Sequence, residues 1–295
     1  MIDVSIVIIS YNTKTLTGEC LESIKKNVSK KISYEIIVVD NASGDESAEF
    51  LRKSFPDVIL IANKDNLGFA KANNVGIKKT TGRYVLCLNS DTVVYPGTLE
   101  YMVDFMDNHK DAGASTCKLE MPNGEIDDAS HRGFPTPWNA ITHFSGIAKV
   151  FPHSKLFSGY WQGWKDLSKT HEVDVLAGAF MLIRREAGDE AGWWDEDYFF
   201  YGEDVDFCYQ LGQKGWKIYY VPEVSILHYK GVSGGIKKTS EKITTATKET
   251  RRRVTSARFN AMRIFYKKHY DKKYPKFLTW LVMQGIGIKE KMASM

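Results

Sequence analysis

The sequence predicts an α/β fold with a Rossmann-like, mostly parallel central sheet and flanking helices. In the first hundred residues, short continuous apolar runs alternate with stretches of helical character. Continuous apolar strands are typical of sheets that are buried on both faces. The 295-residue chain is also 43% hydrophobic and 26% charged, a composition that excludes disordered, collagen-like and coiled-coil proteins.

Four strands rich in Ile and Val are expected first, each ending at polar residues, over residues 4–10, 35–40, 58–62 and 84–89. Helices should begin near Thr15, Asp45 and Phe69, between these strands, and a further helix should run from Pro96 to Met106. From about residue 119 to 172 the periodicity is lost and prolines accumulate, which predicts long loops.

A second ordered block should follow, with strand 173–184, helix 203–214, and strands 216–221 and 225–229. The tail from about residue 239 to 269 is expected to be helical and basic. Residues 237–276 hold 14 Lys and Arg against 3 Asp and Glu, whereas the preceding body is acidic overall. This charge division indicates that the tail, and not the body, meets a polyanion or an anionic membrane.

The cysteines and the apolar runs point to a cytoplasmic protein. The four cysteines are scattered without a CxxC pair, so neither a disulfide framework nor a zinc site is expected. The first apolar run is too short for a signal peptide and is interpreted as a strand. The longest later run, 277–288, is interrupted by Gln284 and two glycines and is too short for a transmembrane helix.

Candidate ligand-binding residues follow the predicted strands, because open α/β sheets bind ligands beyond the carboxyl ends of their strands. These residues are Tyr11, Asn12, Asp40, Asn89 and Asp91. The carboxylate of Asp91 suits a hard divalent cation. On spacing alone, a turn or helix-cap role explains Asp91 and Asp40 better.

The segment 202–206 crowds Glu203, Asp204 and Asp206 at an expected helix start, where negative charge is favoured. Capping explains one or two of these acids. Three together favour a cation, a substrate hydroxyl or a basic neighbour, and the two interpretations weigh about equally. Because adjacent helical positions point about 100° apart, we expect one of Glu203 and Asp204 to be a general base and the other structural.

His228 closes the strand 225–229 and precedes a glycine-rich turn, 230–235, that starts with Lys230. The backbone amides and the lysine of such a turn could meet phosphate. A lone histidine is more often structural, but its place at a strand end favours a functional role here.

Taken together, these residues resemble family 2 of the inverting glycosyltransferases, which have the GT-A fold, and most of all the bacterial rhamnosyltransferases. The resemblance runs from about residue 4 to 233. It rests on seven motifs in the order of the family: 5–12, 37–45, 66–77, 88–91, 173–185, 194–206, and His228 with Gly231 and Ser233.

The resemblance implies a role for each motif. A nucleotide would be held by Tyr11, Asn12, Asp40, Asn66, Gly68, Asn73, Asn89 and Ser90. Asp91, from the Asp-x-Asp motif of the family, and His228 would bind Mg²⁺ or Mn²⁺, with Lys230 and Ser233 at the phosphates. Asp204 would be the general base. The donor sugar and the acceptor would be lined by Gly178, Trp194, Asp195 and Glu203.

The implied enzyme has a GT-A domain over 1–236, with a nucleotide-binding half to about 118 and an acceptor-binding half beyond it, and a basic helical extension over 237–295. It would transfer L-rhamnose from dTDP-rhamnose, or otherwise the sugar of a UDP-sugar, to a hydroxyl of a lipid-linked or cell-surface glycan. The reaction would be a metal-assisted single displacement. Two positions depart from the family: Asn89 replaces the first Asp of the metal motif, and Cys208–Gln210 lacks the Arg that often follows the acidic cluster.

Other functions compete with this interpretation. A nicotinamide-dependent oxidoreductase is disfavoured because the first turn, 10–15, lacks GxGxxG. A catalytically inactive relative that only binds nucleotide sugars remains an alternative, since Asn89 weakens the metal motif. Nucleic-acid binding is not expected, because no recognition motif accompanies the basic tail.

For the tail, we expect peripheral attachment to the inner face of the plasma membrane, with a helix that packs a homodimer partner as the alternative. The headgroup contacts would come from Arg251, Arg252, Arg253, Lys267 and Lys268, and the inserted side chains would be Phe277, Leu278, Trp280 and Leu281.

Overall fold

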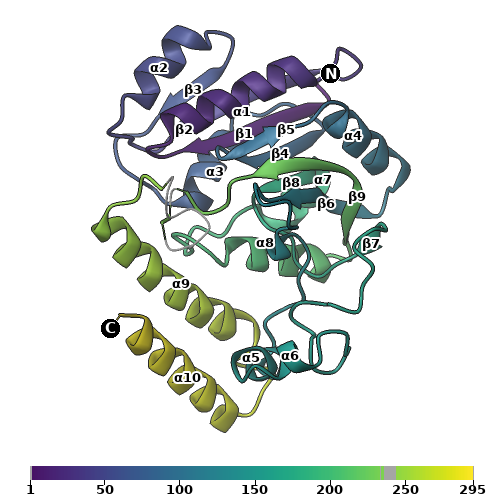
Figure 1. The fold of residues 1–295 in the computed structure, drawn as a ribbon, viewed down its shortest axis with the longest axis vertical. Helices are drawn as coiled ribbons and strands as arrows, with labels where there is room; N and C mark the ends of the chain where they lie inside the picture. Colours follow the sequence, from purple (N-terminus) through teal and green to yellow (C-terminus); the bar gives the residue numbers. More distant parts are fainter. Residues whose placement is uncertain (1, 233, 236–243, 295) are drawn as a thin grey trace.

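The computed structural model describes residues 2–232, 234–235 and 244–294, and Ser233 of the expected phosphate site lies outside them. Within these residues, a nine-stranded sheet has the order β3-β2-β1-β4-β8-β6-β9-β5, with β7 paired to β9 (Figure 1). The strands are β1 (Val4–Ser10), β2 (Tyr34–Asp40), β3 (Ile59–Ala62), β4 (Tyr84–Asn89), β5 (Thr92–Val94), β6 (Ala112–Glu120), β7 (His171–Glu172), β8 (Phe180–Arg184) and β9 (Lys217–His228).

The helices lie between and after these strands. They are α1 (Lys14–Asn27), α2 (Ser47–Ser54), α3 (Phe69–Ile77), α4 (Thr98–Asn108), α5 (Pro137–Phe144), α6 (Ile147–Val150), α7 (Arg185–Ala191), α8 (Glu203–Gln213), α9 (Lys248–His269) and α10 (Lys276–Ser294), with a short 3₁₀ helix, η1, at Asp128–Ser130.

The first half of the sheet is parallel. β1 pairs in parallel with β2 on one side and β4 on the other, and β2 pairs with β3. The β1 strand is almost wholly buried, as its run of Ile and Val predicts. Parallel pairing places the ends of β1, β2 and β4 at one edge, where the polar residues that follow them meet.

The second half of the sheet is mixed. β8 runs antiparallel to both β4 and β6, and β9 runs parallel to β6. The short β5 strand, just after β4, pairs antiparallel with the end of β9 and sets Thr92 opposite His228. This pairing brings the end of β9 back to the edge where β4 ends.

Helices cover both faces of the sheet. Side chains of α1, α2 and α4 pack on one face, around Ile6 and Ile8 of β1. Side chains of α3, α7 and α8 pack on the other, around Val7. The result is a three-layer α/β/α arrangement, which confirms the predicted fold class.

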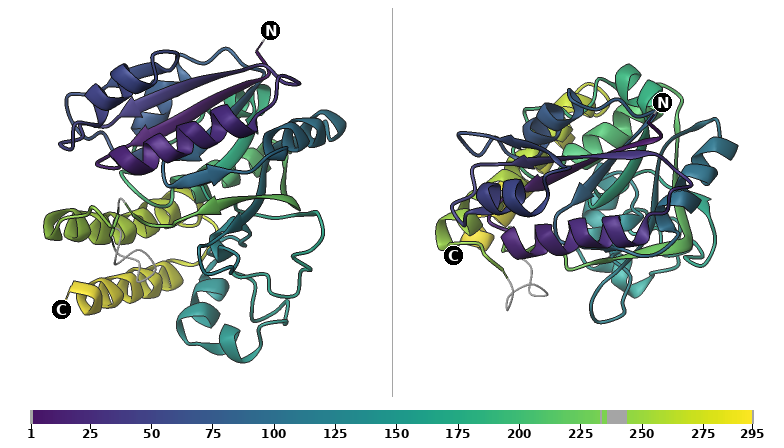
Figure 2. Two further views of the ribbon diagram at one scale, coloured as in Figure 1. Left: turned by 45° about the horizontal axis from the view of Figure 1, so that its top comes forward. Right: turned by 90° about the horizontal axis from the view of Figure 1, so that it is seen from above.

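The C-terminal helices α9 and α10 form a hairpin below the sheet in Figure 1, and Figure 2 shows the two helices side by side. Phe265 and Tyr266 of α9 are buried in the core that contains α8. Tyr209 of α8 meets Phe265 edge to face, with ring centroids 5.8 Å apart. No helix in the described part of the chain has the length and apolar character needed to cross a membrane.

Several element boundaries differ from the sequence predictions. The segment 119–172, expected as loops, contains η1, α5, α6 and β7, and β6 and α7 were not predicted. The expected strand 173–184 is regular only over Phe180–Arg184. The two strands expected after residue 216 form one strand, β9, because a register shift against β6 accommodates Pro222. The tail helix begins at Lys248, and the first expected helical residues, 239–243, lie outside the described ranges.

Candidate active site

A cavity of about 1050 Å³ lies at the carboxyl edge of the parallel strands. Residues from the ends of β1, β4 and β9, from the start of α8 and from the C-terminal hairpin line it. Asp91 and Asp204, the two acids on which the predicted mechanism depends, both line this one cavity. The structure therefore brings the expected metal end and the expected base end together.

One wall of the cavity is polar and comes from the loops after β1 and β3. The predicted residues that line it are Tyr11, Asn12, Asn66, Gly68, Asn89 and Ser90. Asn12 has a positive φ of 53°, and its Oδ1 accepts a hydrogen bond of 2.8 Å from the amide of Gly44. Asn41, at the end of β2, donates 2.9 Å to Asn66 Oδ1. These amide side chains fix the loops that form the wall.

Gly68 lets this wall approach the segment before α8. Its φ is +82°, and an added Cβ would lie 2.4 Å from the carbonyl oxygen of Phe199. The same carbonyl accepts a hydrogen bond of 2.8 Å from the amide of Phe69. Any side chain at residue 68 would separate two segments that both line the cavity.

The metal end of the cavity is built by the ladder between β5 and β9. Nε2 of His228 lies 3.5 Å from Oδ1 of Asp91, and both side chains are buried. Nδ1 of His228 lies 3.0 Å from Oδ2 of Asp127, whose other oxygen is 2.6 Å from Lys230 Nζ. Within the described residues, Nε2 has no well-formed hydrogen bond. The imidazole is thus anchored through Nδ1 and presents Nε2 to Asp91.

The charges of His228, Asp91 and Asp127 stabilise one another. Burial disfavours the charged form of His228, but Asp91 and Asp127 outweigh it and raise the pKa of the imidazole to about 9. Burial likewise opposes ionisation of Asp91, and His228 outweighs it, so the pKa of Asp91 is lowered. In the described part of the chain, no group of three His, Cys, Asp or Glu side chains could hold a metal ion. Asp91 is therefore the ionised side chain at this end that could bind a cation, and His228 could add a second ligand only after its imidazole loses a proton.

The helix α8 begins with the acidic cluster. Gly202 precedes it with a φ of 85°. Asp204 Oδ2 accepts a hydrogen bond of 2.6 Å from Nη2 of Arg132, and its Oδ1 accepts 2.8 Å from the amide of Val205. Arg132, from the segment after η1, is itself largely buried and also lines the cavity. Asp204 is therefore held in one orientation at the cavity wall.

Each of the other two acids is accommodated differently. Burial raises the pKa of Glu203 to about 8, and the charge of Asp204 adds to this effect. Asp206 points away from the cavity and meets His269 Nε2 at 2.6 Å and Lys268 Nζ at 2.9 Å, both from α9. Both Glu203 and Asp204 line the cavity, and the expectation that one of them is a general base and the other structural stays a prediction.

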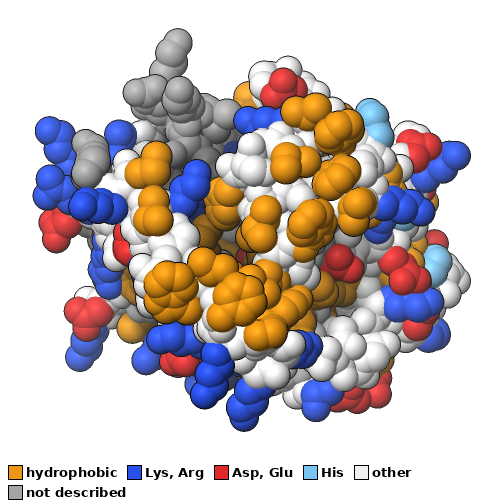
Figure 3. Space-filling view, turned by 90° about the horizontal axis from the view of Figure 1, so that it is seen from below, with side chains coloured by type: hydrophobic (Ala, Val, Ile, Leu, Met, Phe, Trp, Pro, Cys, Tyr) orange, Lys and Arg blue, Asp and Glu red, His pale blue; other side chains and the backbone are white. Residues whose placement is uncertain are grey.

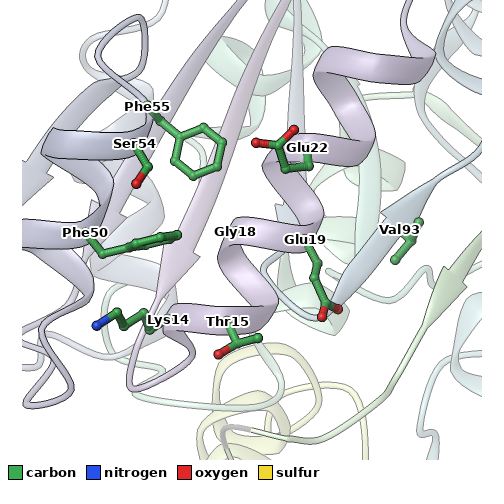
Figure 4. Close-up of a pocket in the computed structure, with 9 residues that line it drawn as sticks. All are labelled: Lys14, Thr15, Gly18, Glu19, Glu22, Phe50, Ser54, Phe55 and Val93. Carbon is green, nitrogen blue, oxygen red and sulfur yellow. The ribbon is translucent and has the colours of Figure 1, made fainter.

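A second hollow, a groove of about 700 Å³ between α1 and α2, is lined by Phe50, Phe55 and Gly18 among others (Figure 4). Lys14 at its edge pairs with Glu46 at 3.2 Å. None of the predicted site residues lines this groove. The chemistry-bearing residues belong to the larger cavity.

Comparison with known sequences identifies the family. The chain matches the sequence profile of glycosyl transferase family 2 over residues 5–191, more than half of its length. The chain belongs to this family.

Curated relatives of this glycosyltransferase act on glycans. It is 28% identical, over 78% of its length and 77% of the relative, to an N-acetylglucosaminyl-diphospho-decaprenol L-rhamnosyltransferase of Mycobacterium tuberculosis. It is 26% identical to a poly-beta-1,6-N-acetyl-D-glucosamine synthase of Staphylococcus aureus, over 70% of this chain and 45% of the relative. The predicted resemblance to family 2, with a rhamnosyltransferase among the relatives, is confirmed.

Solved structures confirm the fold of the glycosyltransferase. GalNAc-T7 with UDP, GalNAc and Mn²⁺ matches with a TM-score of 0.57 and 17% identity, over 77% of this chain and 44% of that one. Residues 1–349 of TarS from S. aureus, in complex with UDP, match with a TM-score of 0.53 and 19% identity, over 88% of this chain and 65% of that one. The chain thus spans less than two thirds of either solved chain.

Four residues predicted for the site of the glycosyltransferase do not line the cavity. Trp194 is buried in the core, with its ring edge to face against Phe69 at 6.0 Å between centroids. Asp195 pairs with Lys268. Asn73 is buried and donates 3.0 Å to the carbonyl of Phe69. In this structure these three side chains make packing and polar contacts within the protein, and their predicted contacts with a ligand stay predictions.

Asp40 is the fourth of these residues. It is buried at the end of β2, where its Oδ2 accepts a hydrogen bond of 3.1 Å from the amide of Ser43. Its Oδ1 finds no partner in the described part of the chain. Its neighbour Asn41 does line the cavity. Asp40 therefore keeps a free acceptor next to the cavity wall, although it forms no part of that wall.

The remaining predicted residues, Gly178 and Lys230, do line the cavity. A Cβ at Gly178 would lie 3.2 Å from the ring of Phe69, so the position favours a small residue. Lys230 is tied to Asp127, so its amine reaches the site as part of an ion pair.

The sequence prediction missed part of the cavity of the glycosyltransferase. Asp127 and Arg132 come from the segment 119–172, which shows no periodicity and was expected to form loops. Its other residues at the cavity include the aromatic side chains of His143, Phe144, Tyr160 and Trp161. The basic tail contributes too, because Arg253 lies over the ring of Phe199 at 3.9 Å and lines the cavity. In the sequence, the signal that could have indicated this part of the cavity is the group of tryptophans after Pro135, together with Tyr160.

Proposed function

We propose that the protein is an inverting sugar transferase that uses a nucleotide diphosphate sugar. L-rhamnose from dTDP-rhamnose is our first choice of donor, with a UDP-sugar as the second. The acceptor is a hydroxyl of a lipid-linked or cell-surface glycan. The observation that carries this proposal is that Asp91 with His228, and Asp204 with Arg132, line the same cavity.

The relatives support the choice of substrates. The mycobacterial relative is named for L-rhamnose transfer to a diphospho-decaprenol carrier. Solved structures with the same fold hold UDP or UDP-GlcNAc. We also propose the functional division expected from the sequence, with a nucleotide-binding half to about residue 118, an acceptor-binding half to 236, and an extension beyond it.

The residues present fit a divalent cation. Asp91 would supply a carboxylate oxygen. His228 would add Nε2, which has no well-formed hydrogen bond in the described part of the chain, once a cation displaces the proton of the imidazole. Mg²⁺ is commonly held by one or two carboxylates and substrate phosphates, and an imidazole ligand shifts the preference modestly towards Mn²⁺. When bound, such an ion supplies positive charge to the departing diphosphate.

The groups of the chain itself would act on the acceptor and the donor. Asp204 takes the proton from the acceptor hydroxyl as its oxygen attacks the anomeric carbon, and the bond to the diphosphate breaks with its electron pair. Attack opposite the leaving group inverts the anomeric centre. Arg132 orients the carboxylate of Asp204, and each oxygen of that carboxylate retains a lone pair beyond its hydrogen bond.

The nucleotide would lie against the polar wall formed by Tyr11, Asn12 and Asn66. Amide side chains and backbone groups there can pair with the edge of a pyrimidine and with ribose hydroxyls. The free Oδ1 of Asp40 supports a role as acceptor for the ring N–H of uracil or thymine, provided that the base reaches past the wall.

A donor panel tests the proposal. Purified protein with Mg²⁺ or Mn²⁺ is mixed with dTDP-rhamnose and with several UDP-sugars, and both the melting shift and the loss of donor sugar are measured. Specific donor binding should raise Tm, and turnover should follow for the same donor. A melting shift without turnover for every donor would instead identify a protein that only binds nucleotide sugars.

The variant Asp204→Asn tests the base. It should lower turnover by about a thousandfold, because general base catalysis is worth about 10² to 10⁴ in rate. The donor-dependent melting shift should persist. Asp197→Asn is the matched control, since Asp197 is an exposed acid in the loop before α8. Turnover retained in Asp204→Asn would remove Asp204 from this role.

A further inference from the structure

The exposed apolar side chains of this protein are concentrated in two segments. In the described part of the chain, every exposed large apolar side chain except Ile59 and Tyr101 lies between residues 138 and 156 or in α10. In the first segment they are Trp138, Ile141, Phe144, Ile147, Val150, Phe151 and Leu156, and in α10 they are Phe277, Trp280, Leu281, Ile288 and Met292. We call these twelve side chains the apolar face. Monomeric proteins rarely expose so many large apolar groups together without a function.

The two segments form one surface. Lys289 of α10 lies over the ring of Phe144 in α5, with its amine 5.1 Å from the ring centroid. In Figure 1, α5, α6 and α10 all lie at the lower end of the molecule. Figure 3 views that end from below and shows apolar side chains gathered across it, with Lys and Arg side chains around their edge. The apolar face is therefore continuous between two parts of the chain that are far apart in sequence.

The charged side chains of the two segments are mostly positive, although Figure 3 shows some Asp and Glu nearby as well. Residues 129–165 contain no Asp or Glu, while Lys149 and Lys155 are exposed beside the apolar side chains. At the ends of α10, Lys276, Lys289 and Lys291 are exposed as well. The acid of α10, Glu290, is paired with Arg263 at 2.5 Å. A face of apolar side chains bordered by lysines is complementary to an anionic lipid surface.

The cavity reaches the same surface. Phe144 is 44% exposed on the apolar face and also lines the cavity. Val282 and Ile286 of α10 line the cavity, whereas Leu281 and Ile288 are exposed on the apolar face. The helix α10 thus separates the interior of the cavity from the outer surface, and the apolar end of the cavity opens beside the apolar face.

We propose that the apolar face docks on an anionic lipid bilayer, with the side chains of α5, α6 and α10 in the interface and the bordering lysines at the headgroups. A second copy of the chain is disfavoured as the occupant, because it would bring the same lysines together. Docking in this way turns the apolar end of the cavity towards the bilayer. An acceptor on a lipid carrier would enter from there, and this route alone rests on the proposed function.

The surface differs from the one that the tail sequence predicts. Two of the five basic residues expected at headgroups already contact other residues of the protein, since Lys268 pairs with Asp195 and Asp206, and Arg253 lies over Phe199. The larger share of the exposed apolar side chains comes from the segment 138–156. The membrane contact is therefore shared between that segment and α10.

Vesicle sedimentation of the full-length protein tests this proposal. The probes are vesicles of phosphatidylcholine alone and vesicles with added phosphatidylglycerol. One variant combines Val150→Asp and Leu156→Asp, and a second combines Phe277→Asp and Trp280→Asp. The matched control combines Ile59→Asp and Tyr101→Asp, which adds the same charge at the exposed apolar side chains outside the apolar face.

The wild type and the control should sediment with the phosphatidylglycerol vesicles, and salt should weaken the binding. Each face variant should bind these vesicles about tenfold more weakly, because two apolar side chains that would enter the bilayer interface are replaced by aspartates. Equal binding of all variants, or no binding by the wild type, would overturn the proposal. So would a wild-type dimer that dissociates in the face variants, because the face would then be covered by a second copy.

The outcome is independent of the sugar chemistry. The same variants are assayed for the donor-dependent melting shift, which should be unchanged because every substituted residue lies outside the cavity lining. A Tm equal to that of the wild type would show that a variant is folded. Failure of donor binding with intact vesicle binding would contradict the proposed function alone, and the reverse result would contradict the docking surface alone.

Discussion

Glu203 lies buried next to Asp204, and a carboxyl group in that position prefers to be neutral. Its pKa rises from 4.5 to about 8 in the folded protein, first because of burial and second because of the charge of Asp204. The folded chain therefore holds this proton more tightly than the unfolded chain does. At a pH between these two pKa values, unfolding releases the proton of Glu203. The contribution of this group to the free energy of unfolding therefore falls as pH rises from about 4.5 to about 8.

Glu203→Gln should remove this pH dependence. Between about pH 5 and about pH 8.5 the Tm of the wild type should fall several °C further than that of the variant. The measurement is thermal unfolding without donor across this pH range. Glu22→Gln, which changes an exposed glutamate of α1, is the control and should follow the wild type. Parallel curves for wild type and Glu203→Gln would contradict the assignment.

Some residues of the site could be predicted because they follow strands. Tyr11, Asn12 and Asp91 come directly after buried apolar runs, and parallel pairing brings such positions to one edge. Asp127 and Arg132 could not be found in this way. Their partners, His228 and Asp204, are about a hundred and about seventy residues away in the chain, and only tertiary packing decides which cation meets which acid.

At the level of elements, Asp206 joins α8 to α9. Its buried carboxylate meets Lys268 and His269 of α9, and it accepts a hydrogen bond of 3.2 Å from the hydroxyl of Tyr198. Nearby, a Cβ at Gly202 would lie 2.9 Å from Cβ of Ala261, so α9 passes close to the start of α8. The helix that carries the proposed base is therefore fixed in part by the C-terminal tail.

Asp206→Asn should loosen this junction. Loss of a buried charge that faces two cationic partners should lower the free energy of unfolding by about 3 kcal/mol. Hydrogen exchange should increase for the amides of α9 more than for those of α1. Asp271→Asn, at an exposed acid of the same hairpin, should change neither quantity. Unchanged exchange in α9 would show that other contacts dock the helix.

The sequence predicted the bounds of a strand correctly where large apolar residues dominate its sequence. The bounds of β1 and β4 agree with the prediction because both strands are dominated by large apolar residues and end at a polar one. β6 was missed because its sequence, AGASTCKLE, has few β-branched or large apolar residues. It forms a strand because β8 and β9 flank it and bury it, which is information that a local pattern does not contain.

At the level of the whole molecule, the cavity has two different ends. Asparagines and acids line the end at the parallel strands, whereas Phe144, Phe265, Val282 and Ile286 line the end at the C-terminal hairpin. A charged nucleotide sugar suits the first end, and an apolar carrier suits the second. We expect donor and acceptor affinities to respond to separate sets of substitutions.

The pair Val282→Ser and Ile286→Ser tests this separation. Both side chains face the cavity from one side of α10, so the variant should raise KM for a lipid-linked acceptor about tenfold. Donor affinity should stay within about twofold, as measured by the melting shift. Gln284→Ser, on the exposed side of the same helix, is the control. A parallel loss of donor affinity would contradict the division of the cavity.

The pairing of β5 with β9 has a consequence for how the chain tolerates change. Because Thr92 stands opposite His228, the approach of the imidazole to Asp91 is set by hydrogen-bond register rather than by a loop. Inserting one amino acid near the end of β9 would place the imidazole of His228 on the opposite face of the sheet. Lengthening the chain between α5 and β7, which holds neither Asp127 nor Arg132, would leave that approach intact, so natural or engineered diversity in acceptor choice should accumulate there and spare the ladder.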